Sequence, residues 1–362
     1  MDTKENKKII EIDGSFGEGG GQILRTATAF SALLKIPCHI LNVRQKRENP
    51  GLAKQHLLYL EALCEFTQGK LEGNYLGSRE IKFYPGDFWK ESLKIKIDTA
   101  ASIILILQGL LLPALFSQSK TKITFEGGAT DTFFAPPFDY FNFVFLPFLD
   151  KLLEKIFKRK VLKINLKLKK RGFYPKGGGE VEIEIYPLPY LAKLEKIEFP
   201  RDKGKVLKIK VFSWASKSLK ERKVAERQIS GMRQTPIFYS KLKMPIEIET
   251  NYIETLSPGS VITVIGEFEN GIFGESSLGE LGKSAEEVGK EAGEKFFEEI
   301  KKGGIVDKYL ADQILPYLAF LTKEAIFSTT EISLHTKTNA WVIRKFLNGK
   351  FEFKENQIFW KR

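Results

Sequence analysis

Helical and strand patterns alternate along the first 186 residues of this chain, which limits the folds that it can form. Apolar residues recur at helical spacing over residues 22–34, 52–67, 99–116 and 137–157. Strand patterns lie between and after these helices, at 38–43, 81–85, 93–97, 121–126, 161–168 and 180–186. Two helices and several strands therefore recur in cycles of roughly 80 residues, as in domains built from repeated units.

The C-terminal part of the chain carries this alternation a third time. Its patterns predict two helices, a strand and a further helix, at 284–301, 307–321, 330–335 and 339–347. We therefore predict an α+β fold in which residues 1–186 plus 279–362 form a large domain of about three repeated helix-and-sheet units. Residues 187–278 have a different texture, with Lys-rich strands and one helix, and are predicted to form a smaller inserted domain, α/β or α+β in class.

The charge of the chain is strongly basic. Its formal net charge is +12 and its pI is about 9.3, which favours polyanionic partners such as nucleic acid or simply gives solubility. Residues 151–176 hold nine Lys and two Arg against Glu154 alone. This segment is either a track for a polyanion or a solvated face of a strand and helix.

Residues 99–119 are uncharged and largely apolar, and their number is close to the roughly 20 apolar residues that a membrane-spanning helix needs. A glutamine, a glycine and a proline interrupt the stretch, which predicts a buried helix instead. No apolar region typical of a secretory signal follows the charged N-terminus. Cys38 and Cys64 lack metal-type spacing and are typical of a reducing compartment. We expect a soluble, cytoplasmic protein.

Residues 13–22, DGSFGEGGGQ, place one glutamate inside a glycine-rich turn at a helix start. Bare backbone N–H groups and the helix dipole there favour anions, which Glu18 would repel. The segment lacks the ending of a P-loop and the spacing of a dinucleotide fingerprint. Either it is only a tight turn, or a cation such as Mg²⁺ stands between Glu18 and an anion.

Several cationic and polar residues follow at the ends of neighbouring elements, where sequential packing brings them to one sheet edge. They are Arg25, Arg44, Arg47, Gln55 and His56. Guanidinium groups match phosphate oxygens, so the set is a candidate anion site, with Glu18 as the metal ligand. The alternative is an ordinary turn flanked by surface arginines.

His335 ends the predicted strand TEISLH, just before a predicted helix capped by Thr338 or Asn339. An imidazole at such a junction can attack phosphorus and form a phosphoramidate if one ring nitrogen is unprotonated and the other is held. Asp312 is the candidate that holds it, although a lone histidine is often structural. The aromatic stretch 133–148 either stacks a base or packs as a helix face that leaves only the turn at 135–137 free.

Taken together, these motifs resemble those of RNA 3′-terminal phosphate cyclases. The matching segments are DGSFGEGGGQILR, RQKRENPGLAKQH, RGFYPKGGGEV, YLADQ and SLHTKTN. The resemblance implies an ATP-dependent, ligase-type reaction on an RNA with a 3′-terminal phosphate. A histidine takes AMP from ATP, the AMP passes to the RNA 3′-phosphate to give RNA(3′)pp(5′)A, and the ribose 2′-OH then expels AMP to leave a 2′,3′-cyclic phosphate.

The resemblance also implies roles for residues at the matching positions. His335 would be the nucleophile, Glu18 would hold a divalent metal (Mg²⁺ or Mn²⁺), and Pro136 would pack on adenine. The ATP pocket would be lined by Gln108, Tyr309, Leu310, Ala311, Asp312 and Gln313. The phosphates of ATP or of the RNA end would be bound by Arg25, Arg44, Arg47, Gln55 and His56. No membrane and no obligate protein partner are expected.

Three other functions remain as alternatives. A non-catalytic cyclase-like factor of RNA processing or ribosome biogenesis would lack the nucleophilic histidine, whereas this chain has His335. A transferase of the enolpyruvyl type would form no covalent nucleotide. A plain RNA-binding protein would explain the net charge but give no role to Glu18 or His335.

Overall fold

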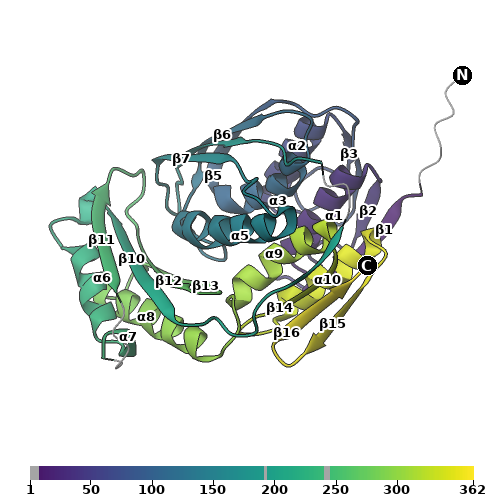
Figure 1. The fold of residues 1–362 in the computed structure, drawn as a ribbon. Coiled ribbons are helices and arrows are strands. Elements are labelled where there is room, and N and C mark those ends of the chain that lie inside the picture. Colours follow the sequence, from purple (N-terminus) through teal and green to yellow (C-terminus); the bar gives the residue numbers. More distant parts are fainter. Residues whose placement is uncertain (1–7, 191–193, 240–244) are drawn as a thin grey trace, which may run out of the picture.

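The computed structural model describes residues 8–190, 194–239 and 245–362 of the chain. Within these ranges lie four four-stranded sheets packed with helices, which confirms the predicted α+β class (Figure 1). Each sheet pairs two strands in parallel and adds antiparallel neighbours. Three of the sheets share one topology, and the fourth belongs to an insertion.

The three related units each follow the order strand, helix, strand, helix, strand, strand. The first consists of β1 (Ile10–Asp13), α1 (Gly21–Leu34), β2 (Cys38–Leu41), α2 (Lys54–Thr67), β3 (Lys70–Glu72) and β4 (Ile81–Tyr84). The second consists of β5 (Ser92–Ser102), α3 (Ile103–Leu115), β6 (Thr121–Ala129), the helical run α4 (Phe138–Tyr140), a π-helical turn (Phe141–Phe145) and α5 (Leu146–Phe157), β7 (Ile164–Lys170) and β8 (Glu180–Ile185). The third consists of β9 (Glu195–Glu198), α9 (Lys308–Leu321), β14 (Thr322–Ser328), α10 (Leu334–Phe346), β15 (Lys350–Lys354) and β16 (Gln357–Lys361).

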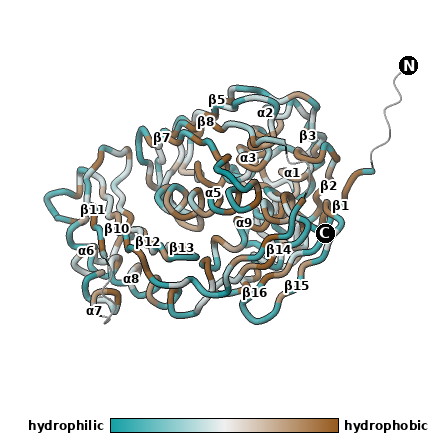
Figure 2. Tube along the Cα trace, viewed as in Figure 1, coloured by the Kyte–Doolittle hydropathy of each residue, from teal (hydrophilic) through white to brown (hydrophobic). Residues whose placement is uncertain are grey.

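The sheet orders confirm that these units are repeats. They run β1-β2-β4-β3, β5-β6-β8-β7 and β9-β14-β16-β15, and in each the first pair is parallel and the next two are antiparallel. The apolar helices lie against the sheets, and α3 is buried along nearly its whole length (Figure 2). Over the described residues, no helix combines the length and apolarity that crossing a membrane requires.

The predicted strand at 330–335 is wrong. The strand of this unit is β14, and α10 begins at Leu334 because the Ser333 hydroxyl accepts a hydrogen bond from the N–H of Thr336 at 3.1 Å. Ile332 and Leu334 alternate with polar residues and so imitate a strand, but the serine cap decides the local structure. His335 therefore lies in the first turn of a helix.

The insertion enters the third unit between β9 and α9. It comprises β10 (Val206–Ser216), α6 (Val224–Arg233), α7 (Pro236–Tyr239), β11 (Ile246–Ile253), β12 (Ser260–Phe268), β13 (Ile272–Leu278) and α8 (Ala285–Lys301). Its separate hydrophobic core includes Ile209, Met232, Phe273 and Phe296. β9 pairs with β14 of the third unit, whereas α8 packs against α6 of the insertion. The division into domains at 187–278 stays a prediction.

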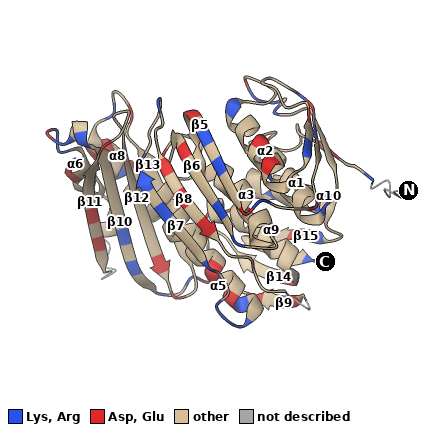
Figure 3. Cartoon of the chain, turned by 90° about the horizontal axis from the view of Figure 1, so that it is seen from above, with Lys and Arg blue, Asp and Glu red and all other residues tan. Residues whose placement is uncertain are grey.

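The basic segment 151–176 includes β7, whose lysines lie beside the glutamates of β8. Lys169 pairs with Glu182 at 3.0 Å and Lys170 with Glu180 at 2.5 Å, so positive and negative charges alternate across this sheet face (Figure 3). Part of the positive charge is thus balanced within the sheet. Binding of RNA to this segment stays a prediction.

A buried arginine pairs with two carboxylates of the second unit and also contacts the insertion. Arg171 contacts Asp131 at 3.0 Å and Asp139 at 2.6 Å, and all three residues are at most 4% exposed. The guanidinium carbon also lies 4.6 Å from the ring centroid of Trp214 on β10. The charge of each carboxylate in this buried site depends on Arg171 for compensation.

We expect Arg171→Ala to lower stability by about 3–5 kcal/mol, because two buried carboxylates lose their partner. Thermal unfolding of the variant and the wild type measures the effect. Lys170→Ala is the control, because its exposed pair with Glu180 should contribute about 1 kcal/mol or less. Equal unfolding midpoints for the two variants would contradict this account.

Candidate active site

A cavity of about 1130 Å³ opens where all three units and the insertion meet. Its wall includes most of the residues predicted for the site: Glu18, Arg25, Arg44, Arg47, Gln55, His56, Gln108, Pro136, Tyr309, Asp312, Gln313 and His335. Leu310 and Ala311 are fully buried in the core of α9 and do not line the cavity. The glycine loop, α1, α9, α10 and the turn at 135–137 are thus brought together at one place.

The glycine-rich loop passes directly over the first turns of α10. Gly17 and Gly19 have φ of +56° and +62°, which side-chain-bearing residues rarely adopt. A Cβ atom on Gly17 would come 2.2 Å from Oγ1 of Thr338, so only glycine allows this approach. The Glu18 N–H donates to the same hydroxyl at 3.4 Å. The carboxylate is thereby held at the cavity wall.

Glu18 meets two cationic side chains, which answers how a carboxylate is tolerated in this loop. One of its oxygens pairs with the Arg47 guanidinium, and the other lies 2.6 Å from Nε2 of His335. Burial opposes ionisation, but the hydrogen bonds and charges of His335 and Arg47 outweigh it, so the pKa of Glu18 lies below its usual value. Glu18 is therefore ionised at neutral pH.

His335 is held through both ring nitrogens. Nδ1 lies 2.9 Å from Oε1 of Gln22, and Nε2 faces Glu18. The Gln22 side chain in turn donates from Nε2 to the Asp312 carboxylate at 2.8 Å. Asp312 itself is 4.0 Å from Nδ1, so it acts on the imidazole mainly through Gln22. Asp312 was predicted from the sequence as the partner of His335, whereas Gln22 was not part of that prediction.

The charges around His335 move its pKa upward. The hydrogen bond from the ring to Glu18 raises the pKa of His335, burial lowers it, and the Asp312 charge raises it further. Burial raises the pKa of Asp312 to about 7, against the lowering effect of His335 and Arg25. About half of the His335 side chain (49%) remains exposed toward the cavity.

The cationic end of the cavity holds three arginines and an uncharged histidine. Burial, together with the charges of Arg25 and Arg44, lowers the pKa of His56 to about 3. Its Nδ1 accepts a hydrogen bond from the Ala53 N–H at 3.3 Å, so the neutral ring carries its proton on Nε2. Arginine forks and a neutral N–H donor together suit phosphate oxygens.

The other end of the cavity is aromatic and apolar. Tyr309 on α9 is 44% exposed and lies edge-on to Tyr140, with ring centroids 6.5 Å apart. Pro136 and the exposed Phe134 line the same cavity, and Gln108 donates to Gln313 at 2.9 Å. Flat apolar surfaces near amide groups suit a nucleoside. The aromatic stretch is otherwise packed, since Phe141, Phe145 and Phe148 are buried.

The cavity wall includes carboxyl groups, Glu18 among them, that bear on the predicted metal site. Among the described residues no group of three or more His, Cys, Asp or Glu could hold a metal ion. Mg²⁺ does not need such a cage, because it is commonly bound by one or two carboxylates together with waters and substrate phosphates. Glu18, whose carboxylate stands at the cavity wall beside Arg47 and His335, fits the role of a single protein ligand.

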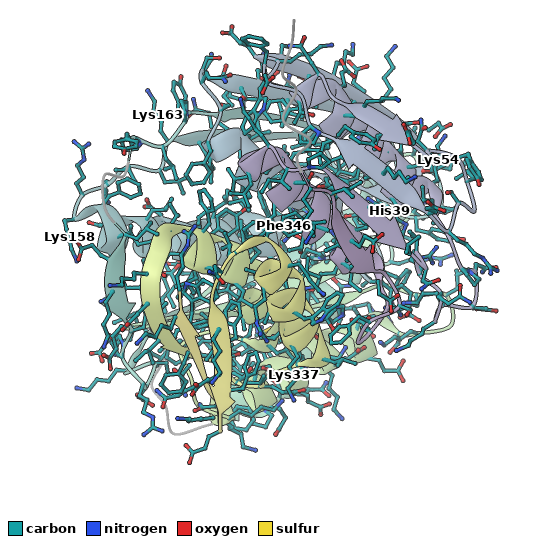
Figure 4. All side chains as sticks on the ribbon, turned by 90° about the vertical axis from the view of Figure 1, so that its right-hand side faces the viewer. His39, Lys54, Lys158, Lys163, Lys337 and Phe346 are labelled. Carbon is teal, nitrogen blue, oxygen red and sulfur yellow. The ribbon has the colours of Figure 1, made fainter. Side chains whose placement is uncertain are left out.

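The remaining histidine, His39, lies outside this site. It belongs to β2, as predicted, and pairs with Glu80 at 2.6 Å at the outer side of the first sheet (Figure 4). The three histidines of the chain thus lie in different environments, with His39 outside the cavity and His56 and His335 at its wall.

The three histidines allow a direct test of the contact with Glu18. We expect Glu18→Gln to lower the pKa of His335, because the variant removes the charge and the ionic hydrogen bond that raise it. An NMR titration of the imidazole Cε1–H signals measures the shift. Glu80→Gln, beside His39, is the control and should leave His335 unchanged. An unaltered His335 titration in Glu18→Gln would contradict the observed geometry.

Comparison with known proteins places the chain in a family. A family model described as RNA 3′-terminal phosphate cyclase matches residues 16–353. A protein named RNA 3′-terminal phosphate cyclase from Ignicoccus hospitalis is 37% identical over 98% of this chain and all of its own length. Proteins of the same name from Pyrococcus abyssi and Thermococcus kodakarensis are 39% identical over 95% of this chain and 95% and 94% of their own lengths. The chain belongs to the RNA 3′-terminal phosphate cyclase family.

Proposed function

We propose that this protein converts the 3′-terminal phosphate of an RNA into a 2′,3′-cyclic phosphate with consumption of ATP. The observation that carries the proposal is His335, which faces the cavity with Nδ1 held by Gln22 beside a cluster of arginines. Membership of the cyclase family supports it. The net charge of +12 suits an RNA substrate.

In the first step, Nε2 of His335 attacks the α-phosphorus of ATP. The N–P bond forms as the bond to pyrophosphate breaks, which leaves AMP on the histidine. Nδ1–H donates to Oε1 of Gln22 in the reactive tautomer, so the lone pair of Nε2 points toward the cavity. Nε2 must leave its contact with Glu18 before it can attack.

The next two steps transfer AMP and then release it. An oxygen of the RNA 3′-phosphate attacks the phosphorus on His335, the N–P bond breaks, and RNA(3′)pp(5′)A forms. The ribose 2′-OH then attacks the 3′-phosphorus and gives up its proton, and AMP departs. The last step requires a 2′-OH, which restricts cyclisation to RNA ends.

The arginines stabilise the charge of these phosphates rather than exchange protons. Arg25, Arg44 and Arg47 line the cavity, and phosphoryl transfer depends mostly on positioning and charge neutralisation. A divalent metal held by Glu18 and phosphate oxygens would add positive charge at the same place. The aromatic end, with Pro136 and Tyr309, would hold the adenine.

We expect the wild-type protein, given ATP labelled at the α-phosphate and a divalent metal without RNA, to acquire a label that survives denaturation. A phosphoramidate is labile to acid and stable to alkali, and His335→Ala should carry none. The control is His39→Ala, whose histidine lies outside the cavity. A wild type without label under either Mg²⁺ or Mn²⁺ would contradict the covalent step and favour a non-catalytic RNA-processing factor.

The labelling rate should also depend on pH in a defined direction. Protonated His335 cannot attack, and its pKa lies above the usual 6.5. The single-turnover rate should therefore be low in acid and rise with pH through a midpoint above 6.5. Labelling followed from about pH 5 to 9 measures it. A rate that is unchanged across this range would show that His335 deprotonation does not limit the step.

A further inference from the structure

Glu275 is a buried carboxyl group that faces the cavity and has no assigned role. It lies on β13 of the insertion, is 5% exposed and forms part of the cavity wall. Its carboxyl group makes neither a hydrogen bond nor an ion pair within the ranges that the structure describes. A carboxyl group that faces the cavity and lacks a protein partner is available to a ligand bound there.

Backbone contacts place Glu275 at the aromatic end of the cavity. The N–H of Gly274 donates to Oδ2 of Asp307 at 3.0 Å. Asp307 caps α9 and accepts hydrogen bonds from the Tyr309 N–H at 2.9 Å and from the Tyr140 hydroxyl at 2.7 Å. β13 is thereby tied to the start of α9, so Glu275 and Tyr309 lie at the same end of the cavity.

The environment of Glu275 favours its neutral form. Burial raises the pKa of Glu275 to about 8, and the charges of Asp307 on α9 and Glu299 on α8 raise it as well. Lys308 and Lys295 lower it without reaching ion-pair distance. A neutral carboxyl group has one oxygen that accepts and one O–H that donates, unlike a carboxylate.

We propose that Glu275 recognises the nucleotide base by accepting a hydrogen bond from the exocyclic amino group of an adenine packed against Tyr309. The O–H of the same carboxyl group donates to the ring nitrogen next to that amino group. Adenine presents this donor and acceptor side by side, so the match is bidentate. The inference rests on the proposed use of ATP and adds the residue that selects its base.

Tyr309 and Pro136 would fix the plane of the base without distinguishing one purine from another, because stacking tolerates every base. Glu275 would supply the polar contact that does distinguish them. A base that lacks the amino group would leave the acceptor oxygen of Glu275 without a hydrogen bond. The free-energy cost of that unpaired oxygen makes adenine the preferred base.

Equilibrium binding of ATP and of purine riboside triphosphate, which lacks the amino group, tests this role independently of catalysis. All variants carry His335→Ala so that the nucleotide is not consumed. With Glu275 present, we expect ATP to bind about tenfold more tightly than the analogue. Glu275→Leu should reduce this preference to about twofold or less, mainly by weakening ATP binding.

Two further variants define the outcome. Glu275→Gln should keep the preference, because its amide oxygen accepts and its amide N–H₂ donates, as a neutral carboxyl group does. Glu249→Leu, an exposed position on β11, is the matched control and should bind like the parent. A Glu275→Leu protein with the parent's preference overturns the proposal. Failure of wild-type labelling would contradict the covalent step while leaving this binding comparison informative.

Discussion

The pair of contacts that His335 makes with Glu18 and Gln22 joins the two ends of the chain, and the site depends on it. Glu18 and Gln22 belong to the first unit and His335 to the third, more than 300 residues away. Thr26 and Asn339 add a buried hydrogen bond of 2.7 Å between the same helices. Because α1 and α10 pack in this way, the glycine-rich loop at residues 13–22 forms one wall of the cavity.

The electrostatics of the cavity follow from this arrangement. Cationic groups stand at the end formed by the first unit, while buried acidic groups of α9 and β13 have raised pKa values, about 7 for Asp312 and about 8 for Glu275. A polyanionic nucleotide therefore meets positive charge at one end, and the buried acidic groups of α9 and β13 carry less negative charge than exposed carboxylates would. Preorganised groups of this kind stabilise transferring phosphates without proton exchange.

Much of the fold could be predicted from the sequence, because it depends on local periodicity. Helix α1 was expected at 22–34 and begins one residue earlier, and the threefold repetition is confirmed by identical sheet orders. The prediction of a strand at 330–335 was wrong, because Ser333 caps a helix in a segment whose apolar and polar residues alternate as in a strand. The roles of Gln22 and Glu275 could not be predicted, since each depends on contacts between segments that are remote in sequence. The position of Leu310 and Ala311 in the core follows from which face of α9 packs inward.

A crystal structure of the protein with Mg²⁺ and an ATP analogue whose α,β-bridging oxygen is replaced by methylene would show whether His335 is placed to attack the nucleotide. We expect the α-phosphorus at about 3–3.5 Å from Nε2 of His335, in line for attack, with Nδ1 still hydrogen-bonded to Gln22. The triphosphate should lie toward the arginines, and the base should lie toward Tyr309. A nucleotide bound outside this cavity, or one whose α-phosphate lies remote from His335, would contradict the role of His335 as the nucleophile.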